Sequence, residues 1–264
     1  MNTTPASTAP QFAIMPLRFS DQPAQMIAFL RTLGLADVVT TQGDNFAELV
    51  AGGGGRVLVH AAAGSETRAH SGTTDLCLMV DSADEAARVL VERGLDAEVW
   101  DESYGRQGAL RLPGGEVVAL NEKQQDLYGY QGHPGTGADE RLRVVGVLDS
   151  PDMDADQAWA QQIGLRAEGE GDEWYRSLGA PGAGALGLHG PGAEVERTRD
   201  VGSELGPSLL VRLGLETSED LASLAERLTA SGYPARVVDE HGLRAVHLTD
   251  PDGEHLEIHP RSDV

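Results

Sequence analysis

The sequence has very little cysteine and almost no lysine. Its single cysteine, Cys77, excludes an internal disulfide, and Lys123 is the only lysine among 20 basic residues. No stretch has the apolar length needed to span a bilayer. The opening residues, MNTTPASTAPQ, lack the basic and apolar regions of a signal peptide. We therefore expect a flexible tail over residues 1–10 and a cytoplasmic location.

Positive charge is also scarce. The 264 residues contain 42 acidic and 20 basic side chains, which gives a net charge of −22. Such a field repels phosphate backbones and anionic membranes, so neither a nucleic acid nor a membrane is expected as a partner. A hydrophobic fraction of 40% is typical of a soluble globular protein with a real core.

Repetition is the most informative feature that the sequence does have. Four helix-like segments, LRTLGL, LVERGL, AQQIGL and LTASGY, each end in glycine, at Gly34, Gly94, Gly164 and Gly232. Glycine stops helices there because it adopts a left-handed conformation without strain. Helix starts recur as well: Ser82 with Glu85 has capping-box spacing, Pro151 follows Ser150, and Asp220 follows Thr217.

Strand-like runs flank each predicted helix. One run precedes it (AIMPLRF, DLCLMV, RVVGVL, LLVRLGL), and short alternating runs follow it. The unit is therefore β-α-β-β-β, present four times. The predicted modules span 11–63, 72–125, 141–192 and 206–260, in domains at 11–127 and 141–264, with a linker at 128–140. A looser charged connector, HGPGAEVERTRDVGSELGP, lies inside the second domain, and the glycine run at 52–55 is interpreted as a hairpin turn.

Four such modules, with the ending DPDGEHLEIHP, resemble the vicinal oxygen chelate superfamily, which includes glyoxalase I, bleomycin-resistance proteins and extradiol dioxygenases. The resemblance implies an α+β fold with two tandem domains. In each domain two modules would form a cup-shaped mixed sheet, with helices outside and the site inside. Two complete cups in one chain are compatible with a monomer or a homodimer. The scaffold hosts enzymes and plain drug-binding proteins, so the fold leaves the function open.

Metal-using members of this superfamily place ligands in the first and last strands of each module. Carried over to this sequence, the positions in the first cup are Ile14, Leu58, Asp75 and Ala119. Those in the second cup are Val144 or its neighbour Arg143, Gly187, Leu210 and Glu257. Neither set contains the three ligands that a catalytic metal needs. The resemblance therefore favours no metal, and leaves Glu257 as the remaining candidate ligand.

The segment around Glu257 leaves a displaced metal site open as an alternative. His255, Glu257 and His259 alternate, so on a strand they share one face. His255 and His259 would be roughly 13 Å apart and cannot both reach one ion. An adjacent pair is still able to share a divalent ion (Fe, Zn, Mn or Ni) with another strand, for example through His247.

Other residues are candidates for binding a small organic ligand. Arg212 is expected to point into the same cup as Glu257 and to pair with it or clamp a substrate carboxylate. Asp75 has no obvious partner and is able to accept a hydrogen bond from a ligand amine. Phe46 and Trp174 occupy corresponding places, where an aromatic ring either stacks on a planar ligand or packs in the core.

We expect a metal-free protein that binds a small organic molecule, such as an antibiotic or secondary metabolite. The alternative is a lyase, isomerase or dioxygenase with a displaced metal, or with Glu257 as a general base whose pKa is raised by burial. A pure interaction module ranks last. The strong negative charge favours cationic or neutral ligands.

Overall fold

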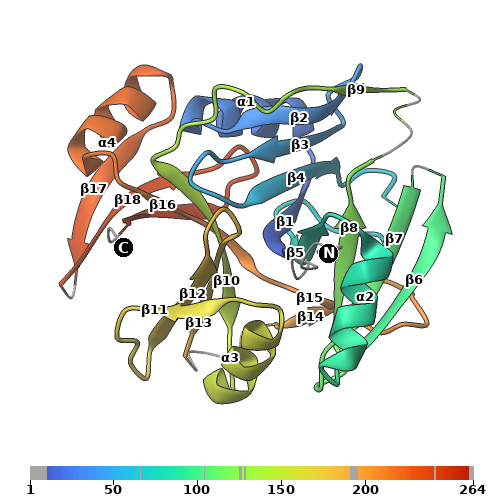
Figure 1. Ribbon diagram of the computed structural model, residues 1–264. Coiled ribbons are helices and arrows are strands. Elements are labelled where there is room, and N and C mark those ends of the chain that lie inside the picture. Colours follow the sequence, from blue (N-terminus) through green and yellow to red (C-terminus); the bar gives the residue numbers. More distant parts are fainter. Residues whose placement is uncertain are drawn as a thin grey trace, which may run out of the picture.

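The computed structural model describes residues 11–65, 67–103, 105–124, 127, 129–190, 196–240 and 242–261. Two mixed sheets form the molecule (Figure 1), and each is built from two modules. The tail predicted for residues 1–10 lies outside the described residues. In the described part of the chain, no helix is long and apolar enough to cross a membrane.

The first sheet contains the first two modules. Its main elements are β1 (Ala13–Ser20), α1 (Pro23–Leu33), β2 (Ala36–Thr41), β3 (Phe46–Val50), β4 (Arg56–Ala61), β5 (Thr74–Val80), α2 (Ala83–Glu92), β6 (Asp96–Glu102), β7 (Gly105–Arg111), β8 (Val117–Glu122) and β9 (Tyr130–Gly132). The strand order is β9-β2-β3-β4-β1-β5-β8-β7-β6. The two modules join through their first strands, because β1 and β5 pair antiparallel.

The second sheet repeats this plan. It contains β10 (Leu142–Asp149), α3 (Met153–Gln162), β11 (Arg166–Glu168), β12 (Tyr175–Ala180), β13 (Gly184–His189), β16 (Arg212–Thr217), α4 (Leu221–Ala230), β17 (Ala235–Glu240), β18 (Leu243–Thr249) and β19 (His255–Pro260). The strand order is β11-β12-β13-β10-β16-β19-β18-β17, and β10 pairs antiparallel with β16. The predicted α+β fold with two tandem cup-forming sheets is confirmed.

The helix boundaries follow the sequence signals. The hydroxyl of Ser82 accepts a hydrogen bond from the backbone N–H of Glu85 and so caps α2. Asp152 and Asp220 cap α3 and α4 in the same way, so the cap of α3 lies just after the predicted Ser150–Pro151 start. The four helix-stop glycines all have positive φ: Gly34 (121°), Gly94 (85°), Gly164 (96°) and Gly232 (93°).

Two buried cores hold the molecule together, and each contains residues from both sheets. One core joins α2 and α3 to the sheet faces behind them, and includes Leu90 and Trp159. The other joins α1 and α4, and includes Leu30 and Leu224. Figure 1 shows α1 and α4 together at one end of the molecule and α2 and α3 at the other. The helices therefore cover the convex faces, and the concave faces remain for the two cups.

The glycine run at 52–55 forms the turn between β3 and β4, as interpreted from the sequence, and it also contacts the other half. A Cβ on Gly54 would lie 2.9 Å from backbone atoms of Gly182 and Gly184, in the turn between β12 and β13. The backbone N–H of Gly55 donates to the carbonyl of Gly182. Glycine is required here because two backbones approach too closely for side chains.

The charged connector of the second half belongs in part to the first sheet. Its strand β14 (Thr198–Arg199) pairs with β15 (Ser208–Leu209), which directly follows the connector, and Ser208 of β15 pairs with Val117 of β8. Leu210 forms an isolated bridge with Asp75. Within the predicted linker, β9 pairs with β2 and extends the same sheet.

Candidate functional site

The floor of the first cup is apolar. Met15, Leu58, Cys77 and Met79 form a buried cluster there, with Phe46 and Ala119 packed against it. Ile14, predicted to face this cup, instead lies in the core between the sheets. That prediction was wrong by one residue: Met15 is the neighbour on the concave side, and alternation on a strand reverses every side chain when the register slips. No metal ligand set arises from these apolar side chains.

Asp75 is a charged side chain on this floor, and it has a partner. Arg199 of β14 forms an ion pair with it, with Nε 3.2 Å from Oδ1; Asp75 is buried and the Arg199 side chain is 12% exposed. The guanidinium also donates to the carbonyl of Thr67 and lies over the ring of Phe19. Burial raises the pKa of Asp75, although the hydrogen bond and charge of Arg199 oppose this shift. The expectation that Asp75 lacks a partner was wrong, because the connector supplies one.

Cys77 lies beside Asp75 on the same face. Burial, and secondarily the charge of Asp75, raise the pKa of its thiol strongly. A thiol held protonated is a poor nucleophile, which agrees with the sequence interpretation. The first cup therefore has a largely apolar floor, and its carboxylates Asp75 and Glu48 are both neutralised from within the chain, Glu48 by Arg56.

The floor of the second cup is polar. Arg143 of β10 is buried and donates to Glu168 at 2.8 and 2.9 Å and to Glu216 at 3.0 Å. Ser177 adds a hydrogen bond to Glu168. Of the two positions considered on β10, Arg143 faces the cup and Val144 lies in the core. This closed network fixes one side of the floor, because each charge is paired and hydrogen-bonded.

Tyr175 is the aromatic side chain of this cup. Its hydroxyl lies over Gly187, where an added Cβ would be only 2.6 Å from the hydroxyl oxygen. Burial of the hydroxyl raises the pKa of Tyr175 to about 12. Trp174, predicted to correspond to Phe46, is 59% exposed. The strand register shows the reason. Phe46 pairs with His60, and the corresponding pair in the second cup is Tyr175 with His189. The sequence alignment of Phe46 with Trp174 was therefore wrong by one residue.

Arg212 does not pair with Glu257, which corrects the expected contact between them. Its Nη2 and Nε lie 3.0 and 3.2 Å from the carboxylate of Asp149 on β10. The ring of His189 approaches the same carboxylate, with Nδ1 3.6 Å from Oδ1. More than half of the Arg212 side chain is exposed, so this pair lies at the open part of the cup.

Three histidines surround Glu257 on the opposite part of the cup. Nε2 of His259 lies 2.9 Å from Oε2 of Glu257, and Nε2 of His255 lies 3.3 Å from Oε1. The ring of His247 on β18 packs against that of His255, with centroids 4.9 Å apart. The structure therefore brings together the alternating residues of β19 and the neighbouring-strand histidine.

Glu257 is ionised more readily than an ordinary glutamate. Burial acts to raise its pKa, but the hydrogen bond from His259 and the charges of the three histidines outweigh burial and lower the pKa. The general-base hypothesis assumed a raised pKa, and that assumption was wrong. The carboxylate is half-exposed, so its histidine neighbours rather than desolvation set the direction.

The residues at the superfamily's metal positions do not fit a catalytic metal in this cup. Val145 pairs with Gly214, and continuing the register by one residue from the Leu215–Ile258 pair places Gly214 beside Glu257. Gly214 and Val145 offer no ligand atom next to the carboxylate. Leu210, the predicted position on the fourth module's first strand, lies before β16 and contacts the first sheet.

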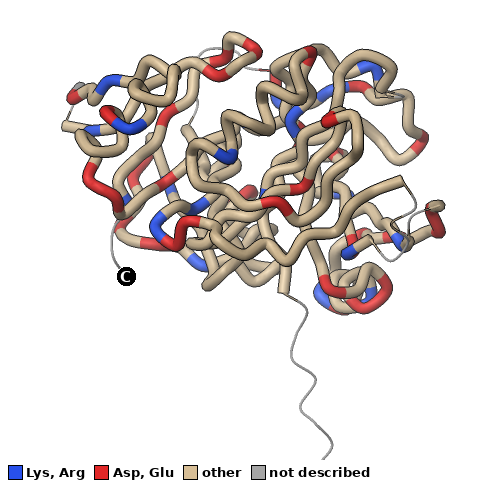
Figure 2. Tube along the Cα trace, turned by 90° about the horizontal axis from the view of Figure 1, so that it is seen from above, with Lys and Arg blue, Asp and Glu red and all other residues tan. Residues whose placement is uncertain are grey.

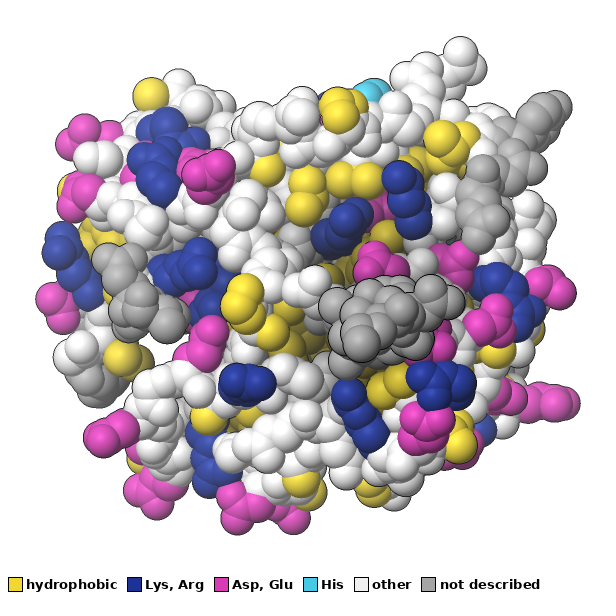
Figure 3. Space-filling model, in the orientation of Figure 1, with side chains coloured by type: hydrophobic (Ala, Val, Ile, Leu, Met, Phe, Trp, Pro, Cys, Tyr) yellow, Lys and Arg dark blue, Asp and Glu magenta, His cyan; other side chains and the backbone are white. Residues whose placement is uncertain are grey.

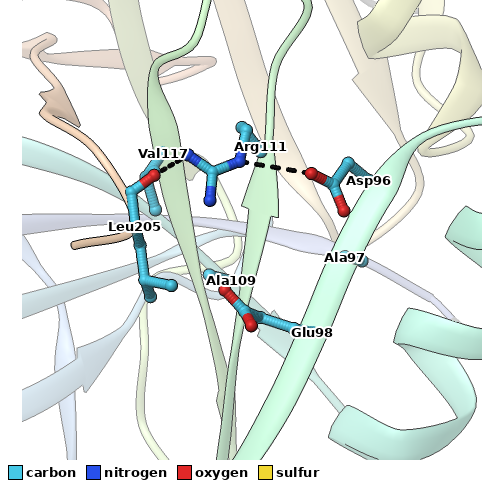
Figure 4. A pocket seen from close by; sticks show the side chains of 7 residues that line it. All are labelled: Asp96, Ala97, Glu98, Ala109, Arg111, Val117 and Leu205. Carbon is cyan, nitrogen blue, oxygen red and sulfur yellow. Dashed lines mark hydrogen bonds and ion pairs between the residues drawn. The ribbon is translucent and has the colours of Figure 1, made fainter.

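Hollows in the surface lie at the edges of the sheets. A cavity of about 300 Å³ adjoins β11, β12 and α3 and is lined in part by Gln157, Glu168, Arg176 and Ser177. A smaller hollow lies beside β6 and β7, where Arg111 bridges Asp96 and the carbonyl of Leu205 (Figure 4). On the face in Figure 3, hydrophobic side chains gather near the centre between basic ones. Figure 2 shows acidic residues over both halves, with basic residues interspersed among them.

Sequence reasoning missed Arg199, Tyr175 and Asp149 as parts of the two cups. Arg199 lies in the charged connector, which carried no periodic signal, and its contact with Asp75 spans more than a hundred residues. Tyr175 was detectable, because it is adjacent to the chosen Trp174 and only the alternation of the strand distinguishes them.

Comparison with known proteins supports the fold. No protein-family model and no curated protein match the sequence. Solved structures do match: a homoprotocatechuate 2,3-dioxygenase from Arthrobacter globiformis has 14% identity and a TM-score of 0.54, over 97% of this chain and 82% of that one. A Mn(II)-bound glyoxalase from Novosphingobium aromaticivorans has 15% identity and a TM-score of 0.54, over 94% and 80%.

A third match is a xylose isomerase-like TIM barrel/4-hydroxyphenylpyruvate dioxygenase fusion protein, with 18% identity and a TM-score of 0.58. The match covers 98% of this chain and about half the length of the fusion protein, at 50%. Identities this low carry no argument about substrate or activity. The matched structures, together with the paired βαβββ modules, show that the chain has the vicinal oxygen chelate fold, as two tandem cup-shaped sheets.

Proposed function

We propose that this protein binds a small organic molecule in its second cup. The observation that carries the proposal is the difference between the two concave faces. In the first cup, Arg199 from the connector occupies the space beside Asp75 and neutralises it. In the second cup, Tyr175, the Arg212–Asp149 pair and the Glu257 cluster remain partly exposed.

The chemistry of the second cup favours a planar ligand that is cationic or neutral. Its ion pairs contain four carboxylates (Glu168, Glu216, Asp149 and Glu257) and two guanidinium groups (Arg143 and Arg212). The excess of negative charge attracts a cation, and the ring of Tyr175 offers an aromatic surface for stacking. Antibiotics and other secondary metabolites with amine-bearing ring systems have this combination.

Binding of this kind requires no metal on the cup floor. The floor positions beside Glu257 are Gly214 and Val145, which leave room above the sheet and contribute no ligand atoms. A ligand would be oriented by hydrogen bonds to Tyr175, His189 and the exposed edge of Arg212.

The test is a binding screen by thermal shift and calorimetry, with planar aromatic amines compared with carboxylates of matched shape, in buffer containing EDTA. We expect amines to bind with one site per chain. Tyr175→Ala should weaken binding about fivefold, since a stacked aromatic pair is worth about 1 kcal/mol. Phe46→Ala, the matched change in the first cup, should leave affinity unchanged. Loss of binding in Phe46→Ala alone would move the site to the first cup and contradict the proposal.

A second candidate is an enzyme of glyoxalase or extradiol-dioxygenase type, and the histidines around Glu257 favour it specifically. Oε2 of Glu257 lies 2.9 Å from Nε2 of His259, so a proton can pass between the carboxylate and an imidazole, although the lowered pKa makes Glu257 a weaker base than an ordinary glutamate. Glu257→Gln separates the two functions. A binding protein would lose affinity modestly, whereas an enzyme that uses this carboxylate would lose turnover.

A further inference from the structure

We propose that His247, His255 and Glu257 form a binding site for a divalent late first-row transition-metal ion, with Zn²⁺ as the reference ion. The site lies on β18 and β19 at the side of the second cup. It does not depend on the organic ligand proposed above. It shares only Glu257 with the superfamily's ligand positions, and takes its other two ligands from His247 and His255 instead of from β10 and β16.

The backbone register places the three side chains together. His247 pairs directly with Glu257 across β18 and β19, so their Cβ atoms are close neighbours on one face. His255 is two residues before Glu257 on the same strand and therefore points to the same face. Side chains placed by neighbouring strands of a sheet are held more rigidly than side chains on loops.

The side-chain atoms are already close to the separation that one ion requires. One ligand atom from each residue lies within 4.8 Å of the other two. Two ligands of one zinc ion, each at about 2.1 Å, are at most about 4.2 Å apart. A small rotation of these partly exposed side chains closes the difference, and no movement of the strands is needed.

His259 acts as a positioning residue for this site. Its Nε2 holds Oε2 of Glu257 at 2.9 Å, which leaves Oε1 directed at His255. Hydrogen bonds to the atoms that do not bind the ion orient metal ligands and raise affinity. On the other side, Arg236 of β17 pairs with His247 in the register, and its side chain is exposed and therefore has room to turn toward solvent.

The donor set determines the class of ion. Two imidazoles and one carboxylate suit zinc, nickel, copper and iron, whereas calcium and magnesium prefer oxygen ligands alone. Three protein ligands leave at least one coordination position for water or for a donor atom of a bound molecule. The net charge of −22 additionally favours a cation at the surface.

The experiment is calorimetric titration of the metal-stripped, tag-free chain with Zn²⁺, with Co²⁺ absorption spectra as a second readout. We expect one equivalent to bind and the Co²⁺ spectrum to show nitrogen and oxygen ligation. His247→Ala and His255→Ala should each weaken Zn²⁺ binding at least about 100-fold, and His259→Ala about 10- to 100-fold. His133→Ala is the matched control, because His133 follows β9 in the first sheet, where its Nε2 lies 2.8 Å from the hydroxyl of Thr40, and this variant should bind Zn²⁺ like the wild type.

Stoichiometric Zn²⁺ binding that survives His247→Ala would contradict the proposed site. The absence of saturable Zn²⁺ binding to the wild type would contradict it as well. His247→Gln, which keeps a polar side chain of similar size, tests whether a loss reflects the ligand rather than the strand, and circular dichroism checks the fold of every variant. Because the organic-ligand screen is run in EDTA, failure of the metal site and failure of the proposed function are separate results.

Discussion

Arg199 forms a buried ion pair with Asp75, and this contact inserts a side chain from the second half of the chain into the first cup. The two residues are 124 positions apart in sequence. The pair places a connector side chain of one domain beside a carboxylate in the cup of the other, so the two cups differ. In the first cup Asp75 is neutralised by the chain itself, whereas the second cup keeps exposed polar groups.

Removing only one partner of this ion pair should lower the stability of the protein strongly. Arg199→Met leaves Asp75 buried without its counter-ion, and we expect the free energy of unfolding to fall by about 3–5 kcal/mol. The double variant Asp75→Leu with Arg199→Met should recover much of this loss, because it leaves no unpaired charge. Urea denaturation of both single variants and the double variant measures the coupling. Additive losses would show that the pair contributes no coupling.

The carboxylate of Asp156 should make stability depend on pH. Burial acts to raise its pKa, but hydrogen bonds from Arg197 and Ser150 outweigh burial, and the pKa is lowered. A lowered folded-state pKa stabilises the protein above the unfolded-state value of about 3.9 and loses that contribution as the pH falls through the folded-state value. Asp156→Asn should be less stable at pH 7 and should lose less stability than the wild type between pH 5 and pH 2.

That variant has a local probe. Trp159 donates its indole N–H to Asp156, so its fluorescence reports on the same carboxylate. The control is Asp84→Asn, since Asp84 is an exposed partner of Arg106 and should change stability little. Equal acid sensitivity of the wild type and Asp156→Asn would contradict the assignment.

The contact between the glycine turns should be sensitive to a single methyl group. Gly54→Ala places a Cβ 2.9 Å from the backbone of Gly182 and Gly184. Gly64→Ala is the matched control, because Gly64 also has positive φ but has no neighbouring atom within 4 Å of an added Cβ. Both variants carry conformational strain, and Gly54→Ala should cost about 1–3 kcal/mol more through steric conflict between the halves. Thermal unfolding measures the difference, which should vanish if the halves separate in solution.

The phenol of Tyr175 should ionise at a higher pH than an exposed tyrosine does. With a folded-state pKa of about 12, it stays neutral while exposed tyrosines ionise near 10. Because the pKa is raised, the stability linked to this group is complete below about 10 and is lost as the pH rises toward 12. Ultraviolet titration of the wild type and Tyr175→Phe should differ by one late-ionising phenol. A difference near pH 10 instead would show that the hydroxyl is solvated.

Much of the fold was predictable because its signals are local. The glycine stops, the Ser82 cap and the alternating runs each act within a few residues, and their fourfold repetition identified the modules and the paired cups. The glycine turn at 52–55 was also predicted as a hairpin, although its contact with Gly182 was not, since that contact joins two distant turns.

The site was predicted only in part. The sequence by itself determined that His255, Glu257 and His259 share a face, because strand alternation requires it. Only the tertiary structure decided that His247 pairs with Glu257, that Arg199 reaches Asp75, and that Tyr175 rather than Trp174 enters the cup. Those relationships depend on strand register and on contacts between distant segments, and a shift of one residue along a strand, which local sequence barely distinguishes, turns a side chain from the cup to the opposite face.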